Sequence, residues 1–231
     1  MNRRRPSVKI NRTHVSKMPQ PSPSAAFIAL EGVCLSRPVG LGGPFVRQKR
    51  VEVFRDLGLE MPRRGLVTVT GGPGAGKSSL LLMLSGALRP DAGRITVDGS
   101  EPWRLAGRKR RRAFAKNLYL GQNPALWHLA ERAGELGEEA LARAEPLIGK
   151  ITDDAPLAGM DRWRRLGLAL GARAALEPAA LLVDDPLAGL GPNERGRLVV
   201  WLAGEPSARL VVVADPGRGA FGGVAERVIG L

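Results

Sequence analysis

Short apolar runs with the character of β-strands dominate the first half of the chain. Five such runs occur between residues 27 and 120: FIALEGVCL, VEVF, RGLVTVT, RITVDG and NLYL. A helix-forming run, KSSLLLMLSGAL, separates the third from the fourth and ends at the stop signal RPDAG. The basic stretch GRKRRRAFAK, which precedes the fifth run, is typical of a solvated helix. The pattern therefore predicts five strands with helices between the later ones.

The second half of the chain alternates helices and strands more regularly. Two or three helical segments are expected between Ala125 and Leu176, with interruptions at Pro146 and around Pro156. After them come a strand at AALLVDD, a helix at ERGRLVVWLA, a strand at ARLVVVAD and a last strand at AERVIGL. Strands that alternate with helices predict an α/β fold whose parallel sheet is covered on both faces.

Composition is that of a globular domain with a strongly basic surface. The 231 residues are 44% hydrophobic, which fits one α/β domain, or one domain with a small satellite, and excludes wholesale disorder. The formal net charge of +13 attracts phosphate in general. The excess arginines are spread along the whole chain and form no focused patch, so no specific nucleic-acid site is expected.

The N-terminal segment, the lengths of the apolar runs and the single cysteine indicate the cellular compartment of the protein. Residues 1–24 are polar, basic and interleaved with proline and serine, which predicts a disordered basic tail. No apolar signal core follows the basic MNRRR, and no apolar run reaches the ~20 residues of a bilayer span. The one cysteine, Cys34, cannot form an internal disulfide and is expected to be a small core residue. We therefore expect an intracellular protein, and a separate chain as the channel if anything crosses a membrane.

A phosphate-binding loop is the strongest chemical signal. The segment GGPGAGKS matches the G-x-x-x-x-G-K-[ST] pattern, with an apolar strand before it and an apolar helix after it. Glycines allow consecutive backbone N–H groups to face phosphate oxygens, and the helix dipole points at the same oxygens. Lys77 is expected to reach the β- and γ-phosphates, and the Ser78 hydroxyl to ligate magnesium. The predicted nucleotide-binding residues are Gly71, Gly72, Pro73, Gly74, Ala75, Gly76, Lys77, Ser78 and Ser79.

Several further segments resemble a known family of phosphate-loop proteins. The wording GGPGAGKSS is similar to the loop of adenylate-type nucleotide kinases. From about Ala25 to Leu231, however, LEGVCLS, SGALRPDAGRITVDG, YLGQNPALWHL and LEPAALLVDDPLAGLGPNER resemble landmarks of the ABC transporter nucleotide-binding domain, in the correct order. The resemblance implies a RecA-like P-loop NTPase core, an N-terminal antiparallel β subdomain and a short helical subdomain at about residues 123–176.

The resemblance also implies ATP and Mg²⁺ as cofactors and assigns roles to three more residues. Gln122 takes the place of the family's Q-loop glutamine, as a metal ligand and part of the catalytic site. Asp184 ends a buried apolar run, where a carboxylate is costly unless a cation neutralises it, and it stands with Ser78 as a magnesium ligand. Asp185 occupies the position of the family's catalytic base.

Departures from the family pattern concentrate in the hydrolytic parts. Asp185 replaces the usual glutamate and is one methylene shorter, and a carboxylate withdrawn by about 1 Å can cost on the order of a hundredfold in rate. Ala214 or Asp215 stands where the switch histidine is expected. The signature LSGGQ is best matched by the degenerate run of residues 157–161, LAGMD. Gly191 occupies the position of the D-loop aspartate. Arg37 falls near the position of the aromatic residue that stacks on adenine. The sequence predicts good binding of Mg·ATP and slow hydrolysis.

The family's architecture suggests the partners. A membrane permease subunit and a second ATP-binding subunit, in a homodimer or a heterodimer, are expected, with the chain cytoplasmic and peripheral at the inner face of the cell membrane. A homodimer would place this chain's shortened base and its degenerate signature together in both nucleotide sites. Pairing with an intact ATP-binding subunit would leave only one damaged half in each site, which favours a heterodimer. Two alternatives remain: a regulatory ATP-binding protein that uses nucleotide as a conformational ligand, and a nucleotide or small-molecule kinase.

Overall fold

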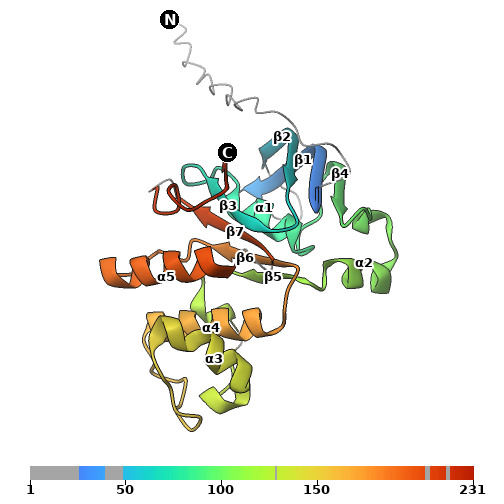
Figure 1. Cartoon of the computed structure of the whole chain (residues 1–231). Helices are drawn as coiled ribbons and strands as arrows, with labels where there is room; N and C mark the ends of the chain where they lie inside the picture. Colours follow the sequence, from blue (N-terminus) through green and yellow to red (C-terminus); the bar gives the residue numbers. More distant parts are fainter. Residues whose placement is uncertain (1–25, 40–48, 128, 206–208, 217–218) are drawn as a thin grey trace, which may run out of the picture.

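Two sheets and a separate group of helices make up the structure, a computed structural model that describes residues 26–39, 49–127, 129–205, 209–216 and 219–231 (Figure 1). The predicted basic tail, residues 1–24, lies outside the described residues. The strands are β1 Ile28–Val39, β2 Lys49–Met61, β3 Gly65–Thr70, β4 Ala92–Val97, β5 Asn117–Leu120, β6 Ala180–Asp184, β7 Leu210–Asp215 and β8 Arg227–Gly230. The helices are α1 Lys77–Leu84, α2 Gly107–Phe114, α3 Glu138–Ile148, α4 Arg162–Ala175 and α5 Pro192–Gly204. Three short 3₁₀ turns are η1 Pro102–Arg104, η2 Pro124–Leu126 and η3 Ala133–Leu136.

The larger sheet is parallel and has the strand order β5-β6-β7-β3-β8. Alternate residues of its central strands enter two different cores, because successive side chains of a strand point to opposite faces. Val67, Leu182 and Val212 join one core, together with the apolar residues of α1. Their sequence neighbours on the other face pack against α4 and α5. The sequence prediction of a parallel sheet covered on both faces is confirmed.

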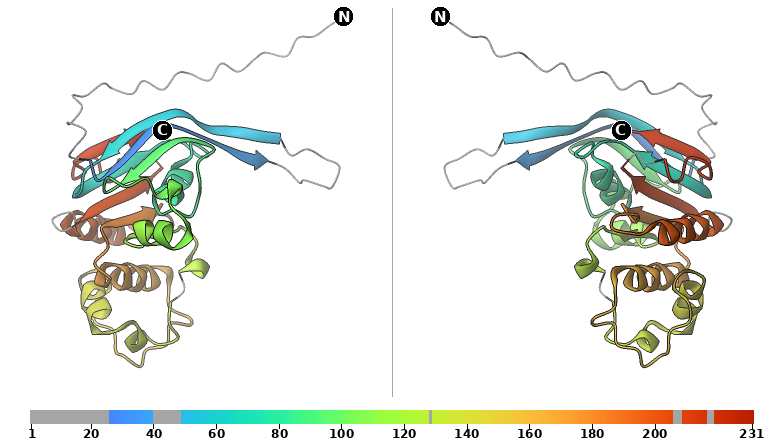
Figure 2. Two further views of the ribbon diagram at one scale, coloured as in Figure 1. Left: turned by 90° about the vertical axis from the view of Figure 1, so that its right-hand side faces the viewer. Right: turned by 90° about the vertical axis from the view of Figure 1, so that its left-hand side faces the viewer.

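The smaller sheet is antiparallel, with the order β2-β1-β4, and it encloses α1 against the larger sheet. Figure 2 shows these long strands arching over the remainder of the molecule. The sheet supplies nine of the 22 buried residues of the first core, which buries Ile28, Met61 and Leu80 completely. The expected N-terminal antiparallel subdomain is therefore present, and it lies directly against the segment that carries the phosphate loop.

Helices α3 and α4 pack side by side below the larger sheet and form the third part of the structure (Figures 1 and 2). A small core of Ala133, Ala144, Leu157 and Leu168 lies between them and the neighbouring turns. This group occupies the segment expected to form a short helical subdomain, whose boundaries at about 123–176 stay a prediction. Among the described residues, no helix is both long and apolar enough to span a bilayer.

Two local expectations were wrong. Helix α3 does not stop at Pro146 but continues through it to Ile148. The proline lies in the last turn, so the helix loses only the one hydrogen bond to the Ala142 carbonyl and ends two residues later. Strand β2 is 13 residues long, far beyond the expected VEVF, and it contains Asp56 in a left-handed conformation (φ 52°). Register shifts between β1 and β2 absorb this irregularity, which hid the strand's second half in the sequence pattern.

Cys34 also differs from the expected core residue. It is half-buried on β1, and its Sγ lies 3.5 Å from the backbone nitrogen of Asp56 on the neighbouring strand.

Candidate functional site

The carboxyl ends of the parallel strands bring the predicted site residues to one edge of the sheet. Thr70, the last residue of β3, is in register with Asp215 of β7. Asp184, the last residue of β6, is in register with Ala214 of β7. Loops that leave this edge are the usual place for ligands in open α/β sheets. The phosphate loop and both acidic strand ends therefore open onto the same surface.

The loop from Gly71 to Gly76 turns the chain from β3 into α1 with donors exposed. Gly71, Gly74 and Gly76 have φ values of 153°, 80° and 99°, all in the positive range that favours glycine. In the described part of the chain, only one N–H of the turn, that of Ala75, is used internally, on the carbonyl of Gly72 at 3.2 Å. The N–H groups that form no hydrogen bond there are those of Gly74, Gly76, Lys77, Ser78 and Ser79. A series of free donors at the start of a helix is a ready site for phosphate oxygens.

Close packing on the antiparallel sheet fixes the shape of this loop. A Cβ atom added at Gly76 would lie 2.6 Å from Cζ of Phe54 and 2.6 Å from Cγ1 of Val53. By contrast, a Cβ added at Gly74 would meet no atom within 4 Å. The side of the loop at Gly76 is therefore pressed against β2, while the side at Gly74 is open for a ligand.

Lys77 places its charge at the mouth of the loop. Its Nζ donates to the carbonyl of Gly71 at 2.5 Å and to the carbonyl of Gly72 at 2.9 Å. Both bonds are made to neutral acceptors, so the ammonium retains its full charge for an anion. The role of Lys77 on a polyphosphate stays a prediction.

Asp184 is a buried carboxylate with a single neighbouring donor in the described residues. It is 3% exposed, and its Oδ2 accepts a hydrogen bond of 2.9 Å from the Tyr119 hydroxyl on β5. Burial, and then the adjacent Asp184 charge, raise the pKa of Tyr119 well above its ordinary value. Tyr119 therefore stays protonated and acts as a donor, which holds the carboxylate at the strand end. Sequence analysis missed this residue, because a contact across 65 positions leaves no local signal.

Asp185 begins the loop after β6 in a left-handed conformation, with φ at 44°. Its N–H donates to the carbonyl of Ala214 at 3.1 Å, which ties the residue to the end of β7. A non-glycine residue in this region of backbone space carries strain, and such strain is common at functional sites. The structure thus places the expected base at the same sheet edge as Asp184.

Gln122 lies two residues after β5 and is exposed. Strand pairing of Leu120 with Val183 brings the Gln122 loop to the same edge as Asp184. The loop is held by Trp127, whose Nε1 donates to the carbonyl of Gly121 at 2.7 Å.

The predicted magnesium ligand Ser78 lies in the first turn of α1, where it is half-buried.

The degenerate signature, residues 157–161, forms the turn before α4. Its last residue, Asp161, is the N-cap of the helix, and its side chain accepts from the N–H of Arg164 at 2.8 Å. A carboxylate in this position already satisfies and neutralises the helix N-terminus, so it opposes the approach of a second anion. Asp215, one of the two residues that could stand at the switch position, is 2% exposed at the end of β7. Arg37 is exposed on β1, opposite Val51.

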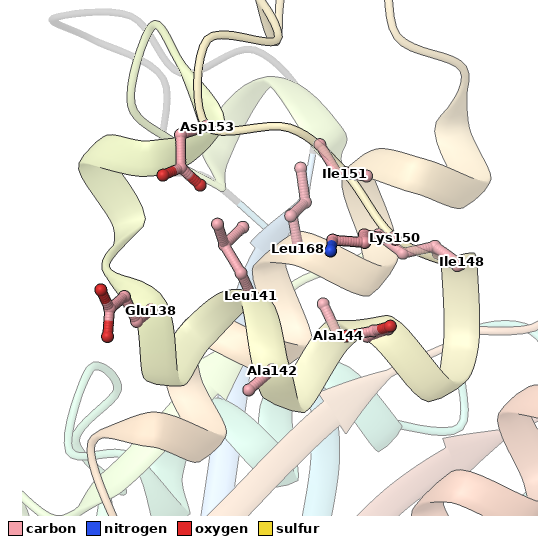
Figure 3. A pocket seen from close by; sticks show the side chains of 11 residues that line it. Glu138, Leu141, Ala142, Ala144, Ile148, Lys150, Ile151, Asp153 and Leu168 are labelled. Carbon is pink, nitrogen blue, oxygen red and sulfur yellow. The ribbon is translucent and has the colours of Figure 1, made fainter.

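Two hollows lie away from the phosphate loop. Figure 3 shows one, of about 410 Å³, which is lined by apolar Leu141, Ile148 and Leu168 and by charged Glu138, Lys150 and Asp153. It contains none of the predicted site residues. A second hollow, of about 660 Å³, is lined by Ala125, by residues 129–132, by residues 156–158 of the segment before α4 and by Arg165.

The geometry fits the cofactors that the sequence suggested. Free N–H groups and an ammonium at one helix N-terminus suit a polyphosphate, and a buried carboxylate beside them suits a divalent cation. A parallel sheet with this loop after a central strand defines the class of P-loop nucleotide-binding folds.

Comparison with known proteins gives the family. The family model described as ABC transporter matches residues 54–188. The chain belongs to the ABC transporter family, which removes the nucleotide-kinase interpretation.

Three similar proteins illustrate the match. The sulfate/thiosulfate import ATP-binding protein CysA of Synechocystis is 32% identical over 163 residues, which are 64% of this chain and 44% of that protein. The daunorubicin resistance ATP-binding protein DrrA3 of Streptomyces coeruleorubidus is 39% identical over 159 residues, covering 63% and 48%. The dimeric structure of MJ0796, a bacterial ABC transporter cassette, superposes with a TM-score of 0.73 at 18% identity, covering 88% and 94%, and shows the fold. The chain spans about half the length of the two curated relatives named here.

Proposed function

We propose that this chain is the ATP-binding subunit of an ABC-type transporter and that it binds Mg·ATP between the phosphate loop and Asp184. The observation that carries the proposal is the group of free N–H donors, from Gly74 to Ser79, beside the Lys77 ammonium. The family and the names of the relatives support ATP as the nucleotide.

Each residue has a defined task in this proposal. The free N–H groups and Lys77 bind the phosphates, while Ser78, Asp184 and Gln122 hold Mg²⁺, which supplies charge neutralisation for phosphoryl transfer. Tyr119 orients Asp184 through its 2.9 Å hydrogen bond. Asp185 orients the attacking water and accepts its proton.

Calorimetric titration with Mg·ATP tests the binding step. Replacing Lys77 by alanine removes a charge-assisted contact, and we expect the affinity to fall by about 10- to 150-fold. Lys150→Ala is the matched control, because Lys150 is exposed after α3 and distant in sequence from the loop. If wild type gave no binding heat, or if Lys77→Ala and Lys150→Ala bound equally, the proposal would fail.

We further propose that hydrolysis is slow because Asp185 is one methylene shorter than the usual base. The left-handed backbone and the bond to Ala214 fix the Cα position, so the side chain has little means of reaching further. Steady-state turnover should therefore rise by about 10- to 100-fold in Asp185→Glu. Asp185→Asn, which has the same length and no basicity, should show no gain. Turnover in wild type at the level of ordinary ABC ATPases would contradict the idea.

A permease partner and a peripheral place at the inner face of the cell membrane complete the proposal. The second hollow, lined by Ala125 and residues 129–132, offers a binding place on the segment that follows Gln122, the residue expected to report the nucleotide state. The solvent-facing cations of α2 lie between β4 and β5, close in sequence to that loop. Such a cluster is attracted to anionic headgroups. Release of the protein from membranes by moderate salt, when it is produced together with its permease, is the expected behaviour.

The second ATP-binding subunit is best supplied by a different chain. In the family's composite sites, the signature of one chain faces the nucleotide bound by its partner. In this chain the signature segment is the turn before α4, where the Asp161 carboxylate caps the helix and repels phosphate. A heterodimer would then contain one site with this chain's phosphate loop and an intact partner signature. Sedimentation equilibrium with Mg·ATP should show no stable homodimer, and a nucleotide-dependent homodimer would contradict this part.

A further inference from the structure

Three arginines on one face of α4 donate to a series of backbone carbonyls in the Gln122 loop. Arg162, Arg165 and Arg173 are separated by three and eight positions, which places them within about 80° of one another around a helix of 3.6 residues per turn. In the described residues, none of them forms an ion pair with a carboxylate. Their guanidinium groups are instead directed at the chain segment that follows β5.

The contacts cover the loop from one end to the other. Arg173 donates through Nε to the carbonyl of Tyr119 at 3.2 Å and through Nη2 to the carbonyl of Trp127 at 3.3 Å. Arg165 donates through Nη2 to the carbonyl of Pro124 at 3.2 Å. Burial lowers the pKa of the Arg173 guanidinium from its ordinary value, which marks this end of the stripe as desolvated.

Arg162 joins this loop to the one that carries Asp185. Its Nη1 lies 3.4 Å from the carbonyl of Gln122, and its Nε donates to the carbonyl of Ala188 at 2.9 Å. The guanidinium also lies over the Trp127 ring, 5.6 Å from the centroid. One side chain thus contacts the Gln122 loop, the loop after β6 and the start of α4.

We propose that Arg162, Arg165 and Arg173 are positioning residues that make α4 and residues 121–127 move as one body, so that α4 sets the place of Gln122 at the site. Backbone carbonyls are the acceptors, so the contacts fix the course of the loop whatever its side chains are. Through its bond to the Ala188 carbonyl, Arg162 also fixes the loop that begins with Asp185 relative to α4. The role in turnover depends on the proposed ATPase function, whereas the mechanical coupling does not.

Hydrogen exchange on the full chain without nucleotide tests the coupling directly. In Arg165→Gln, amide protection of residues 121–127 should fall by about tenfold, while β7 keeps its protection and the melting temperature changes little. Arg164→Gln is the matched control. Arg164 points to the opposite side of α4, and its side chain is 58% exposed. Unchanged protection of residues 121–127 in Arg165→Gln, or an equal loss in Arg164→Gln, would overturn the proposal.

A double-mutant cycle in single-turnover hydrolysis tests whether Arg165 acts through Gln122. Arg165→Gln should lower the rate by about 10- to 100-fold with the Mg·ATP dissociation constant within about threefold of wild type. In a Gln122→Ala background, the same change should cost nothing more. Additive losses would mean that Arg165 acts elsewhere and would overturn the positioning role. Absence of hydrolysis in wild type would refute the proposed ATPase activity, and the exchange measurement would then still decide the coupling.

Discussion

The contact between the phosphate loop and β2 gives a sharp test of how the site is built. Gly76 combines a φ of 99° with a Cβ position that is 2.6 Å from Phe54 and Val53, whereas Gly74 has a φ of 80° and open space. Alanine in the left-handed region costs about 1–2 kcal/mol. Only Gly76→Ala adds an overpacking cost of about 1–3 kcal/mol.

Thermal unfolding of the two variants separates the two contributions. For a chain of this size, 1 kcal/mol shifts the melting temperature by about 2–4 °C. Gly76→Ala should therefore melt roughly 2–12 °C below Gly74→Ala, since the backbone cost and the unfolded-state effect are common to both. Mg·ATP affinity should also fall more in Gly76→Ala, because the displaced loop turns its donors away. Equal melting temperatures would refute the idea that β2 fixes the loop.

Two further predictions concern Tyr119 and α2. Tyr119 is the only tyrosine in the chain, and its raised pKa means that the folded state keeps a proton which the unfolded state loses; stability should therefore decline as the pH rises above about 10. Tyrosinate absorbance should appear only on unfolding. Tyr119→Phe should lack this tyrosine-dependent part of the decline in stability. Full tyrosinate absorbance in the folded protein near pH 10 would contradict the raised pKa of Tyr119. For α2, replacing Arg111 and Arg112 by glutamine should weaken binding to vesicles with anionic lipid by about 30-fold, at about 1 kcal/mol per charge. The charge-matched control is the double variant Arg89→Gln with Lys150→Gln. An equal loss of binding in both double variants would mean that net charge, and not α2, determines the binding.

Local signals account for the parts of this fold that the sequence predicted. The phosphate loop is one continuous motif, with a strand before it and a helix after it, so its place between β3 and α1 could be read directly. Asp184 was predicted from the apolar run that it ends, and the structure buries it. These features depend on neighbours in the chain, which a single sequence displays.

Contacts between distant segments explain what the sequence did not reveal. The Tyr119–Asp184 hydrogen bond joins two strands, and each residue alone is unremarkable in the pattern. The α4 arginines were part of a general excess of basic residues, and their acceptors are carbonyl groups that every residue has. The continuation of α3 through Pro146 depends on the proline's place in the last turn, which only the helix end defines.

Binding and hydrolysis place different demands on the same edge of the sheet. Phosphate binding needs free N–H groups and a positive charge, and these come from one contiguous loop that β2 holds in shape. In the proposed function, hydrolysis needs Gln122 and Asp185 to come together from two other loops, and Arg162 contacts the backbone of both loops. Substitutions in the second set should leave the first intact, because no hydrogen bond or ion pair joins the phosphate loop to α4 within the described part of the chain. A chain can therefore lose its usual base and its switch histidine and still keep a complete phosphate site. If the proposed function and the coupling through α4 hold, nucleotide binding itself is the step by which such a chain drives a partner.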